Sequence, residues 1–158
     1  MREISLTQGK VALVDDEDYE FLNQWKWRHD GNGNRKTGYA MRSLPRTLGK
    51  QTNISMHRFL LKASTGYEVD HANHEGLDNR RINLRLCLRQ ENACNRSGQK
   101  NNVSGFKGVS FHRGTGKWRA VIHHKGKQYN LGHYTTKEDA AKAYNEGAKK
   151  YHKEFASV

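Results

Sequence analysis

Short apolar runs separated by polar stretches predict a small mixed α and β unit at the start of the chain. Residues 10–14 form an apolar run typical of a strand. Asp15 is followed by three acidic residues, and carboxylates are favoured near a helix N-terminus by the helix dipole. We therefore expect a strand that leads directly into a short helix ending near Leu22.

The next forty residues predict further strands and one more short helix. Trp25 and Trp27 alternate with two cations, which predicts a strand with one buried face and both tryptophans in the core. Glycine and asparagine at residues 31–34 predict a turn, and residues 37–42 predict the returning strand. Residues 56–63 predict a short helix.

Residues 67–96 carry the most informative pattern in the chain. They combine a strand (67–71), a polar loop (72–81), a second short strand (82–88) and a helix start (89–96). This order brings the end of the first strand beside the helix.

Three polar side chains can then meet at one point: Asp70, His71 and Asn92. Adjacent strand residues point to opposite faces of a sheet. Asp70 and His71 can therefore share a site only if the strand ends or bends there.

The C-terminal third predicts three antiparallel strands and one helix. The strands are expected within residues 105–111, 117–123 and 127–134, with glycine-containing turns between them. Thr136 with Asp139 is typical of a helix capping box. The apolar stripe that should pack this helix on the sheet consists of Ala140, Tyr144, Ala148, Tyr151 and Phe155. The other face of the sheet is then not covered by the helix. Together with the first unit, these elements predict an α+β fold.

Charge places the boundary between two units. The 158 residues carry a net charge of +12. Residues 1–96 hold 16 basic and 12 acidic side chains, whereas residues 97–158 hold 12 basic and 4 acidic ones. Between them, residues 97–104 are polar and without apolar periodicity, so we interpret them as a linker. The excess of positive charge indicates a polyanionic partner.

Composition excludes several classes of protein. No apolar run approaches the roughly 20 residues that a membrane-spanning helix needs, so we expect no membrane association. The first residues lack the apolar segment of a signal peptide. We therefore expect a soluble protein of the cytoplasm.

Residues 3–96 resemble the H-N-H nucleases, and in particular the homing endonucleases of phage introns, in which the last histidine of the name is often asparagine. The core of the resemblance is Asp70-His71, then Asn83 twelve residues after the histidine and Asn92 nine residues further on. Three flanking segments also agree: Met56-His57-Arg58, Asp78-Asn79-Arg80 and Asn83-Leu84-Arg85.

The resemblance implies a ββα-metal nuclease core at residues 67–96 within a nuclease domain of residues 1–96. It implies that His71 is the general base that deprotonates water, a task that suits a neutral imidazole. It also implies that Asp70 and Asn92 bind Mg²⁺, or Mn²⁺, through oxygen atoms, while phosphate and water take the remaining positions. The products would carry 5′-phosphate and 3′-hydroxyl ends.

Further roles follow from the same resemblance. Asn83 would bond the backbone across the loop and hold His71 in its catalytic position. Arg80 and Arg85 are candidates to brace DNA phosphates.

The remaining histidines and the cysteines have simpler interpretations. His74 lies in the loop outside the pattern, and His57 is interpreted as a structural or phosphate-facing residue of its short helix. Cys87 and Cys94 are too few for a disulfide scaffold or a four-cysteine zinc site. The residue types would also allow a zinc site formed by the two cysteines with two histidines. The spacing of these residues is unusual for such a site, so we expect no zinc.

Residues 105–158 resemble the Apetala-two/ethylene-response-factor DNA-binding domain. The resemblance rests on Gly-Val-Ser-Phe, Lys-Trp-Arg-Ala, Asn-Leu-Gly-His-Tyr and the Glu-Asp-Ala-Ala-Lys-Ala-Tyr helix. It implies that a three-stranded sheet binds the major groove. The candidate DNA contacts are Arg113, Lys117, Trp118, Arg119 and Lys127. The alternative is a solvated basic surface with Trp118 in the core.

Together these patterns predict a metal-dependent DNA endonuclease of homing type, acting on double-stranded DNA in the cytoplasm of a bacterial host. One active site per chain suggests a monomer, or a weak dimer, that nicks one strand. Two alternatives stay open. One is a DNA-binding regulator without catalysis, and the other is a nuclease directed by DNA structure, such as branched DNA.

Overall fold

The computed structural model describes residues 1–31, 38–47, 50–95 and 102–156. The described chain has a mixed α and β architecture with small antiparallel sheets. It divides into two compact units, Met1–Arg89 and Gln90–Val158. No helix among the described residues combines the length and apolar character that crossing a membrane requires.

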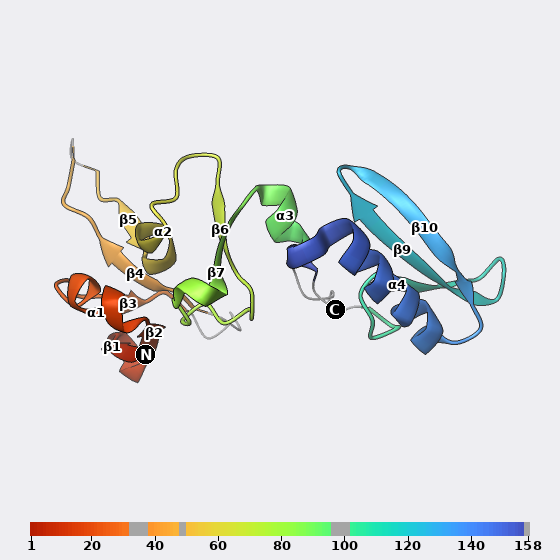
Figure 1. The fold of residues 1–158 in the computed structure, drawn as a ribbon, viewed down its shortest axis with the longest axis horizontal. Helices are drawn as coiled ribbons and strands as arrows, with labels where there is room; N and C mark the ends of the chain where they lie inside the picture. The colour runs from red at the N-terminus through yellow and green to blue at the C-terminus, as the bar shows by residue number, and fades with distance from the viewer. Residues whose placement is uncertain (32–37, 48–49, 96–101, 157–158) are drawn as a thin grey trace. The chain divides into compact units, whose positions relative to one another are not determined.

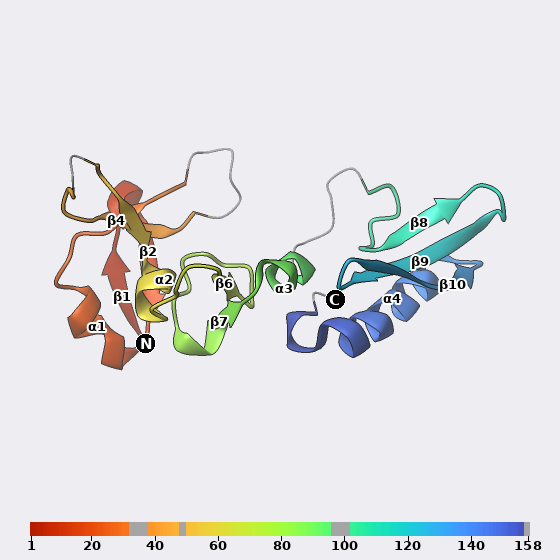
Figure 2. The same cartoon turned by 90° about the horizontal axis from the view of Figure 1, so that it is seen from above.

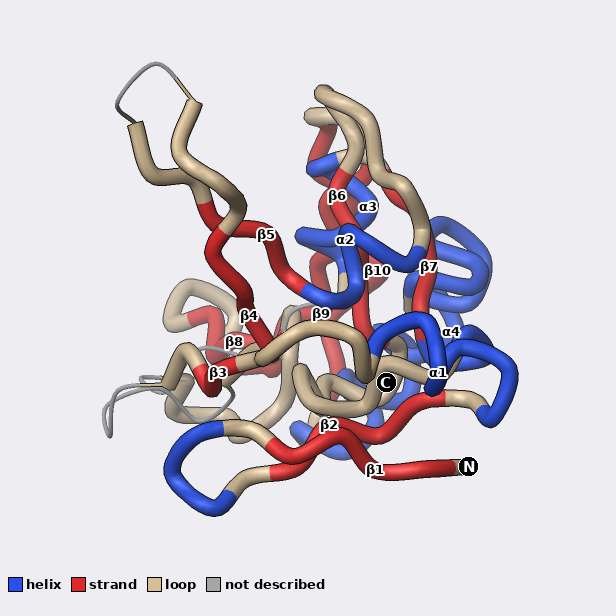
Figure 3. The backbone as a smooth tube through the Cα atoms, turned by 90° about the vertical axis from the view of Figure 1, so that its left-hand side faces the viewer, coloured by secondary structure: helices blue, strands red, loops and turns tan. Residues whose placement is uncertain are grey.

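Among its described residues, the first unit contains three small sheets and two short α-helices (Figure 1). Each sheet pairs its strands antiparallel. The strands are β1 (Arg2–Ser5) with β2 (Val11–Val14), then β3 (Arg28–His29), β4 (Ala40–Ser43) and β5 (Asn53–Ser55), then β6 (Glu68–His71) with β7 (Leu84–Cys87). The helices are α1 (Asp16–Leu22) and α2 (Met56–Leu60). Figure 3 follows the β1–β2 hairpin into α1.

One hydrophobic core joins these elements. Its buried members include Leu22 of α1, Met56 of α2 and Leu84 of β7. The other buried members are Ile4, Leu6, Ala12, Val14, Trp27, Ala40 and Leu60. Burial of each such side chain contributes on the order of 1.5–3 kcal/mol. Leu84 is therefore an anchor that fixes β7, and with it the hairpin that carries the candidate site.

The start of α1 confirms the sequence prediction, but the tryptophan segment corrects it. Asp15 is the N-cap residue of α1, and its carboxylate accepts a hydrogen bond of 2.8 Å from the backbone of Arg81. No strand forms through Trp25 and Trp27 as predicted. The chain turns at the end of α1, and β3 begins only after both tryptophans. There the Trp27 indole donates to the Leu22 carbonyl at 2.9 Å. Trp27 is buried as expected, and Trp25 packs partly buried against the same core.

The second unit is a three-stranded antiparallel sheet with one long helix along one face (Figure 2). The strands are β8 (Val109–His112), β9 (Lys117–His124) and β10 (Lys127–Tyr134), with β9 in the middle. The helix is α4 (Lys137–His152). The predicted cap is confirmed, since the Thr136 hydroxyl accepts from the backbone N–H of Asp139 at 3.1 Å. The short helix α3 (Arg89–Cys94) spans the division between the units.

The helix packs on the sheet through small residues and one tyrosine. The buried cluster comprises Val109, Ala120, Ile122, Ala140, Ala141, Tyr144 and Ala148. Gly108 permits the contact. Its φ of +68° is rarely adopted by residues that carry a side chain, and a Cβ atom there would lie 2.2 Å from the Tyr144 ring. Phe155 of the predicted stripe is also buried, but it follows α4 in a 3₁₀ turn.

Two predicted connections fall partly outside the described residues. Of the predicted turn at residues 31–34, residues 32–34 lie outside them, and so do residues 97–101 of the predicted linker. At the end of that segment, Ser104 is buried and its hydroxyl donates to the Val109 carbonyl at 2.9 Å. Ser104 is thus packed into the second unit.

Candidate functional site

The β6–β7 hairpin carries the predicted Asp-His pair. In its antiparallel ladder, Asp70 lies opposite Arg85 and His71 lies opposite Leu84. Asp70 and His71 are both buried, with 5% and 6% of their surface exposed. β6 ends at His71. The strand therefore ends where a site shared by these two adjacent side chains requires it to end.

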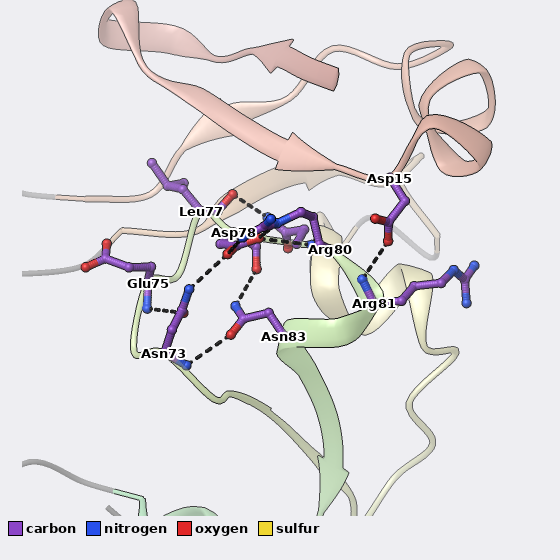
Figure 4. A network of polar contacts seen from close by, with 9 residues as sticks. Asp15, Asn73, Glu75, Leu77, Asp78, Arg80, Arg81 and Asn83 are labelled. Carbon is purple, nitrogen blue, oxygen red and sulfur yellow. Dashed lines mark hydrogen bonds and ion pairs between the residues drawn. The ribbon is translucent and has the colours of Figure 1, made fainter. Parts of the chain in front are cut away.

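Asn83 closes the loop between the two strands. Its backbone carbonyl accepts from the Ala72 N–H at 2.9 Å, and its side-chain oxygen accepts from the Asn73 N–H at 3.0 Å. Its amide nitrogen donates to the Asp78 carbonyl at 2.8 Å (Figure 4). The buried Asn83 thus bonds the start of the loop that follows His71 and also Asp78 within it.

The Asp78 carboxylate is a second group whose hydrogen bonds hold the loop between β6 and β7 together. It accepts from the Asn73 amide at 2.9 Å and from two nitrogen atoms of Arg80 at 2.8 and 2.7 Å (Figure 4). The hydrogen bonds from Arg80 lower the pKa of Asp78, and the same bonds raise the pKa of Arg80. The positive charge of Arg80, a candidate phosphate contact, is therefore already compensated by Asp78 within the loop. The Arg80 side chain is 35% exposed.

The loop is also fixed to the rest of the first unit. The Leu13 N–H donates to the Leu77 carbonyl at 2.9 Å, and the Asn79 N–H donates to the Leu13 carbonyl at 2.8 Å. The Arg81 guanidinium makes a bidentate pair with the buried Asp18 carboxylate at 2.8 and 2.7 Å. Such bidentate pairs fix geometry as well as charge. The sequence pattern predicted Asp18 only as an acidic residue at a helix N-terminus and did not predict its pair with Arg81, because the pairing spans 63 residues.

Asp70 and Arg85 form an ion pair inside the site. The Arg85 guanidinium donates to the Asp70 carboxylate, and the two side chains are 19% and 6% exposed. A buried carboxylate needs a compensating charge, since desolvation of an ion costs several kcal/mol. Arg85, a candidate phosphate contact, thus compensates the charge of the candidate metal ligand.

His71 is enclosed by two further rings. The His57 ring lies 4.9 Å from it, centroid to centroid, at an angle of 87°, and the Tyr39 ring lies 5.7 Å away. Burial lowers the pKa of His71, with Asp70 and Asp78 acting in the opposite direction. The histidine is therefore neutral near pH 7, as a general base must be. Tyr39 was missed by sequence reasoning, because a tyrosine beside an expected turn carries no motif.

Asn92 lies on α3 and belongs to the second unit. Its place in a metal site with Asp70 stays a prediction. No three His, Cys, Asp or Glu side chains within the described ranges group as candidate metal ligands. Within the described residues, Cys87 and Cys94 form no disulfide.

Strand alternation in β9 separates the predicted DNA contacts of the second unit. Lys117 and Arg119 share the face of the sheet opposite α4, and His123 continues the same alternation. Trp118 points the other way and packs partly buried against the helix-side cluster, with its ring 5.3 Å from Phe111.

The remaining predicted contacts lie at the ends of strands. Arg113 is exposed in the turn between β8 and β9, and Lys127 is exposed at the start of β10. On the open face, the rings of His112 and His133 lie 5.1 Å apart, centroid to centroid. Sequence reasoning did not single out these histidines, since the pairing of β8, β9 and β10 is needed to bring them together.

Comparison with known proteins finds relatives that match different shares of the chain. The chain is 28% identical over 156 residues to a protein of Acanthamoeba polyphaga mimivirus named as an uncharacterized HNH endonuclease, covering 95% of this chain and 75% of that protein. It is 39% identical over 66 residues to Protein 3.8 of Escherichia phage T7, covering 42% of this chain and about half, 54%, of that protein.

Plant proteins match a smaller part. An AP2-like ethylene-responsive transcription factor of Arabidopsis thaliana is 41% identical over 56 residues, which is 35% of this chain and 12% of that protein. No family model matches the chain, and no solved structure matches it. The chain is therefore similar to a protein named as an HNH endonuclease and to one named as a transcription factor.

Proposed function

We propose that this chain is a metal-dependent DNA endonuclease of the H-N-H type that nicks double-stranded DNA. The observation that carries the proposal is the buried, neutral His71 beside the buried Asp70, at the end of a hairpin whose loop is bonded by Asn83. The similarity over 95% of the chain to a viral protein named as an HNH endonuclease supports the same assignment.

His71 acts as the general base in this proposal. Its lowered pKa keeps it deprotonated at neutral pH, so that it can accept a proton from the attacking water. General base catalysis of this kind contributes about 10²- to 10⁴-fold to the rate. Asn83 acts indirectly, because its three hydrogen bonds fix the loop that follows His71.

The donor set suits a hard divalent cation. Mg²⁺ is usually bound through one or two carboxylates together with water and substrate phosphate, so a cluster of several protein ligands is not needed. Asp70 and Asn92 would hold the ion, and Arg85 would release part of its contact with Asp70 to do so. When bound, the ion would polarise the scissile phosphate and stabilise the departing oxygen.

The second unit would hold the enzyme on its DNA. Lys117 and Arg119 lie on the open face of the sheet, with Lys127 and Arg113 at its ends. Phosphate contacts from such a surface position the protein, while base contacts give sequence preference. Because the units are covalently joined, binding by one raises the effective concentration of the other at nearby DNA.

A plasmid assay tests the proposal directly. A supercoiled plasmid pool with random inserts is incubated with the protein and Mg²⁺, Mn²⁺, Zn²⁺ or chelator. Metal-dependent conversion to open circle, with 5′-phosphate ends, is the expected result. Equal conversion in chelator would contradict the metal role, and no conversion with any ion would contradict the nuclease assignment.

A second candidate is a DNA-binding regulator without catalysis. The Asp70–Arg85 ion pair favours it, because an arginine that compensates the carboxylate leaves a stable site in the absence of a metal ion. The Arabidopsis thaliana relative, whose name describes a transcription factor, matches 35% of this chain. This candidate predicts DNA binding that is unchanged by metal ions and no cleavage.

A further inference from the structure

Tyr39, His57 and His71 form a cluster of three rings drawn from three separate segments of the first unit. Tyr39 immediately precedes β4, His57 lies on α2 and His71 ends β6. The centroid distances are 4.9 Å between the two histidines, 5.1 Å between Tyr39 and His57 and 5.7 Å between Tyr39 and His71. Each ring therefore contacts both of the others.

We propose that Tyr39 and His57 are positioning residues that hold the His71 ring in its catalytic orientation. The inference rests on the proposed nuclease function, in which His71 is the base. A general base must be held within a fraction of an ångström of its working position, and the two rings packed against His71 restrict the turning of its ring.

His57 is itself rigidly held. It is buried, and its Nε2 atom lies 2.9 Å from the Ser55 hydroxyl. Burial, with smaller contributions from His71 and Arg58, lowers the pKa of His57 to about 3. The ring beside the base is thus uncharged at neutral pH and adds no positive charge that would oppose proton transfer to His71.

Tyr39 is held in place by a backbone hydrogen bond and by close contact with the loop that follows His71. Its carbonyl accepts from the Asp30 N–H at 2.8 Å. Gly76, in the loop that follows His71, lies so close that a Cβ there would be 2.8 Å from the Tyr39 ring and 2.5 Å from the Gly38 carbonyl. The half-buried Tyr39 ring therefore fills the space between the loop and the base.

The tyrosine hydroxyl is not part of this packing. It makes no hydrogen bond to any residue that the structure describes. If the ring alone positions His71, phenylalanine should replace Tyr39 without loss, whereas leucine, which lacks the ring, should not.

The test compares single-turnover nicking and DNA affinity of the full chain with those of Tyr39→Phe, Tyr39→Leu and His57→Gln. Tyr39→Leu and His57→Gln should lose about 10- to 100-fold in the cleavage rate constant, as misplacement of a catalytic group does, with DNA affinity unchanged. Tyr39→Phe should cleave like the wild type. Tyr67→Leu, an exposed tyrosine of the same unit, is the matched control and should also cleave normally.

Thermal unfolding of each variant separates positioning from folding. If Tyr39→Leu does not fold, His57→Gln tests the same contact, since its amide can still bond to Ser55. Wild-type cleavage rates in both folded variants would overturn the inference and leave the proposed function intact. Equal losses in Tyr39→Phe and Tyr39→Leu would also overturn it, by assigning the hydroxyl a direct role. An inactive wild type would instead overturn the proposed function, and the inference with it.

Discussion

The guanidinium of Arg85 is bonded to the carboxylate of Asp70 directly across the β6–β7 ladder. In the proposed mechanism one of these residues holds a metal ion and the other braces a phosphate. Their ion pair makes the two roles dependent on each other, because a cation that binds Asp70 competes with the arginine. Release of Arg85 by the metal ion would leave its positive charge available to the DNA.

Replacement of Arg85 by leucine should destabilise the first unit and make its thermal stability depend on a bound metal ion. Breaking a buried ion pair from one side costs about 3 kcal/mol, because the remaining charge loses its partner. We expect Mg²⁺ or Mn²⁺ to raise the Tm of Arg85→Leu more than that of the wild type. Thermal unfolding with and without chelator checks this. In the double variant Asp70→Asn with Arg85→Leu, the metal effect should vanish, and a persistent effect would argue against Asp70 as a ligand.

Removal of the Asn83 side chain should loosen the loop of the site. Asn83→Ala deprives the Asn73 N–H and the Asp78 carbonyl of their partner, and the unsatisfied buried carbonyl of Asp78 costs about 1–3 kcal/mol. We expect lower stability in urea and slower cleavage. Asn53→Ala, on the exposed edge of β5, is the control and should change stability by no more than about 0.5 kcal/mol. Equal effects of the two substitutions would contradict the anchoring role of Asn83.

The stability of the first unit should fall as the pH is lowered below 6.5. The pKa of His57 is about 3 in the folded chain and 6.5 without the protein environment, so the unfolded chain binds the additional proton first. The stability from the neutral histidine is complete above pH 6.5 and is lost as the pH falls towards 3. One such group gives a slope of up to about 1.4 kcal/mol per pH unit.

Urea unfolding followed by the fluorescence of Trp25 and Trp27 measures this slope. His71, whose pKa is also lowered, contributes in the same direction. His57→Gln should therefore have a shallower pH dependence than the wild type between pH 6 and pH 4. The same slope in both proteins would show that His57 is not the neutral, buried group described above.

Arg119 and Lys149 offer a matched test of the DNA surface. Arg119 lies on the open face of β9, and Lys149 is exposed on α4 behind the sheet. Each alanine variant removes one positive charge. Arg119→Ala should weaken DNA binding and reduce the slope of affinity against salt by about 1, as loss of one phosphate contact does. Lys149→Ala should bind like the wild type. Similar losses in both would indicate only a general charge effect.

The second unit was largely predictable from local pattern. Strand alternation, glycine turns and the Thr136 cap act over a few residues, and the structure has its strands and helix where those signals place them. The first unit was less predictable. Its tryptophan segment alternates like a strand, but the chain turns there, and the Trp27 indole donates to the Leu22 carbonyl five residues earlier.

The candidate site divides in the same way. Spacing was enough to place Asp70, His71 and Asn83 around one hairpin loop, and their catalytic and metal-binding roles stay predictions. Tyr39, Asp18 and Arg81 could not be found, because their contacts join segments far apart in the sequence. Ile82 shows a further limit: it was expected within an apolar strand, yet it lies in a 3₁₀ turn with 88% of its surface exposed.

The most direct test of the account compares DNA cleavage by the wild type and by His71→Ala in Mg²⁺, at protein concentrations that saturate the DNA. The account predicts that the variant binds DNA as the wild type does but loses about 10²- to 10⁴-fold in the rate of strand cleavage, the contribution of a general base. Cleavage by His71→Ala at the wild-type rate would contradict the assignment of His71 as the base.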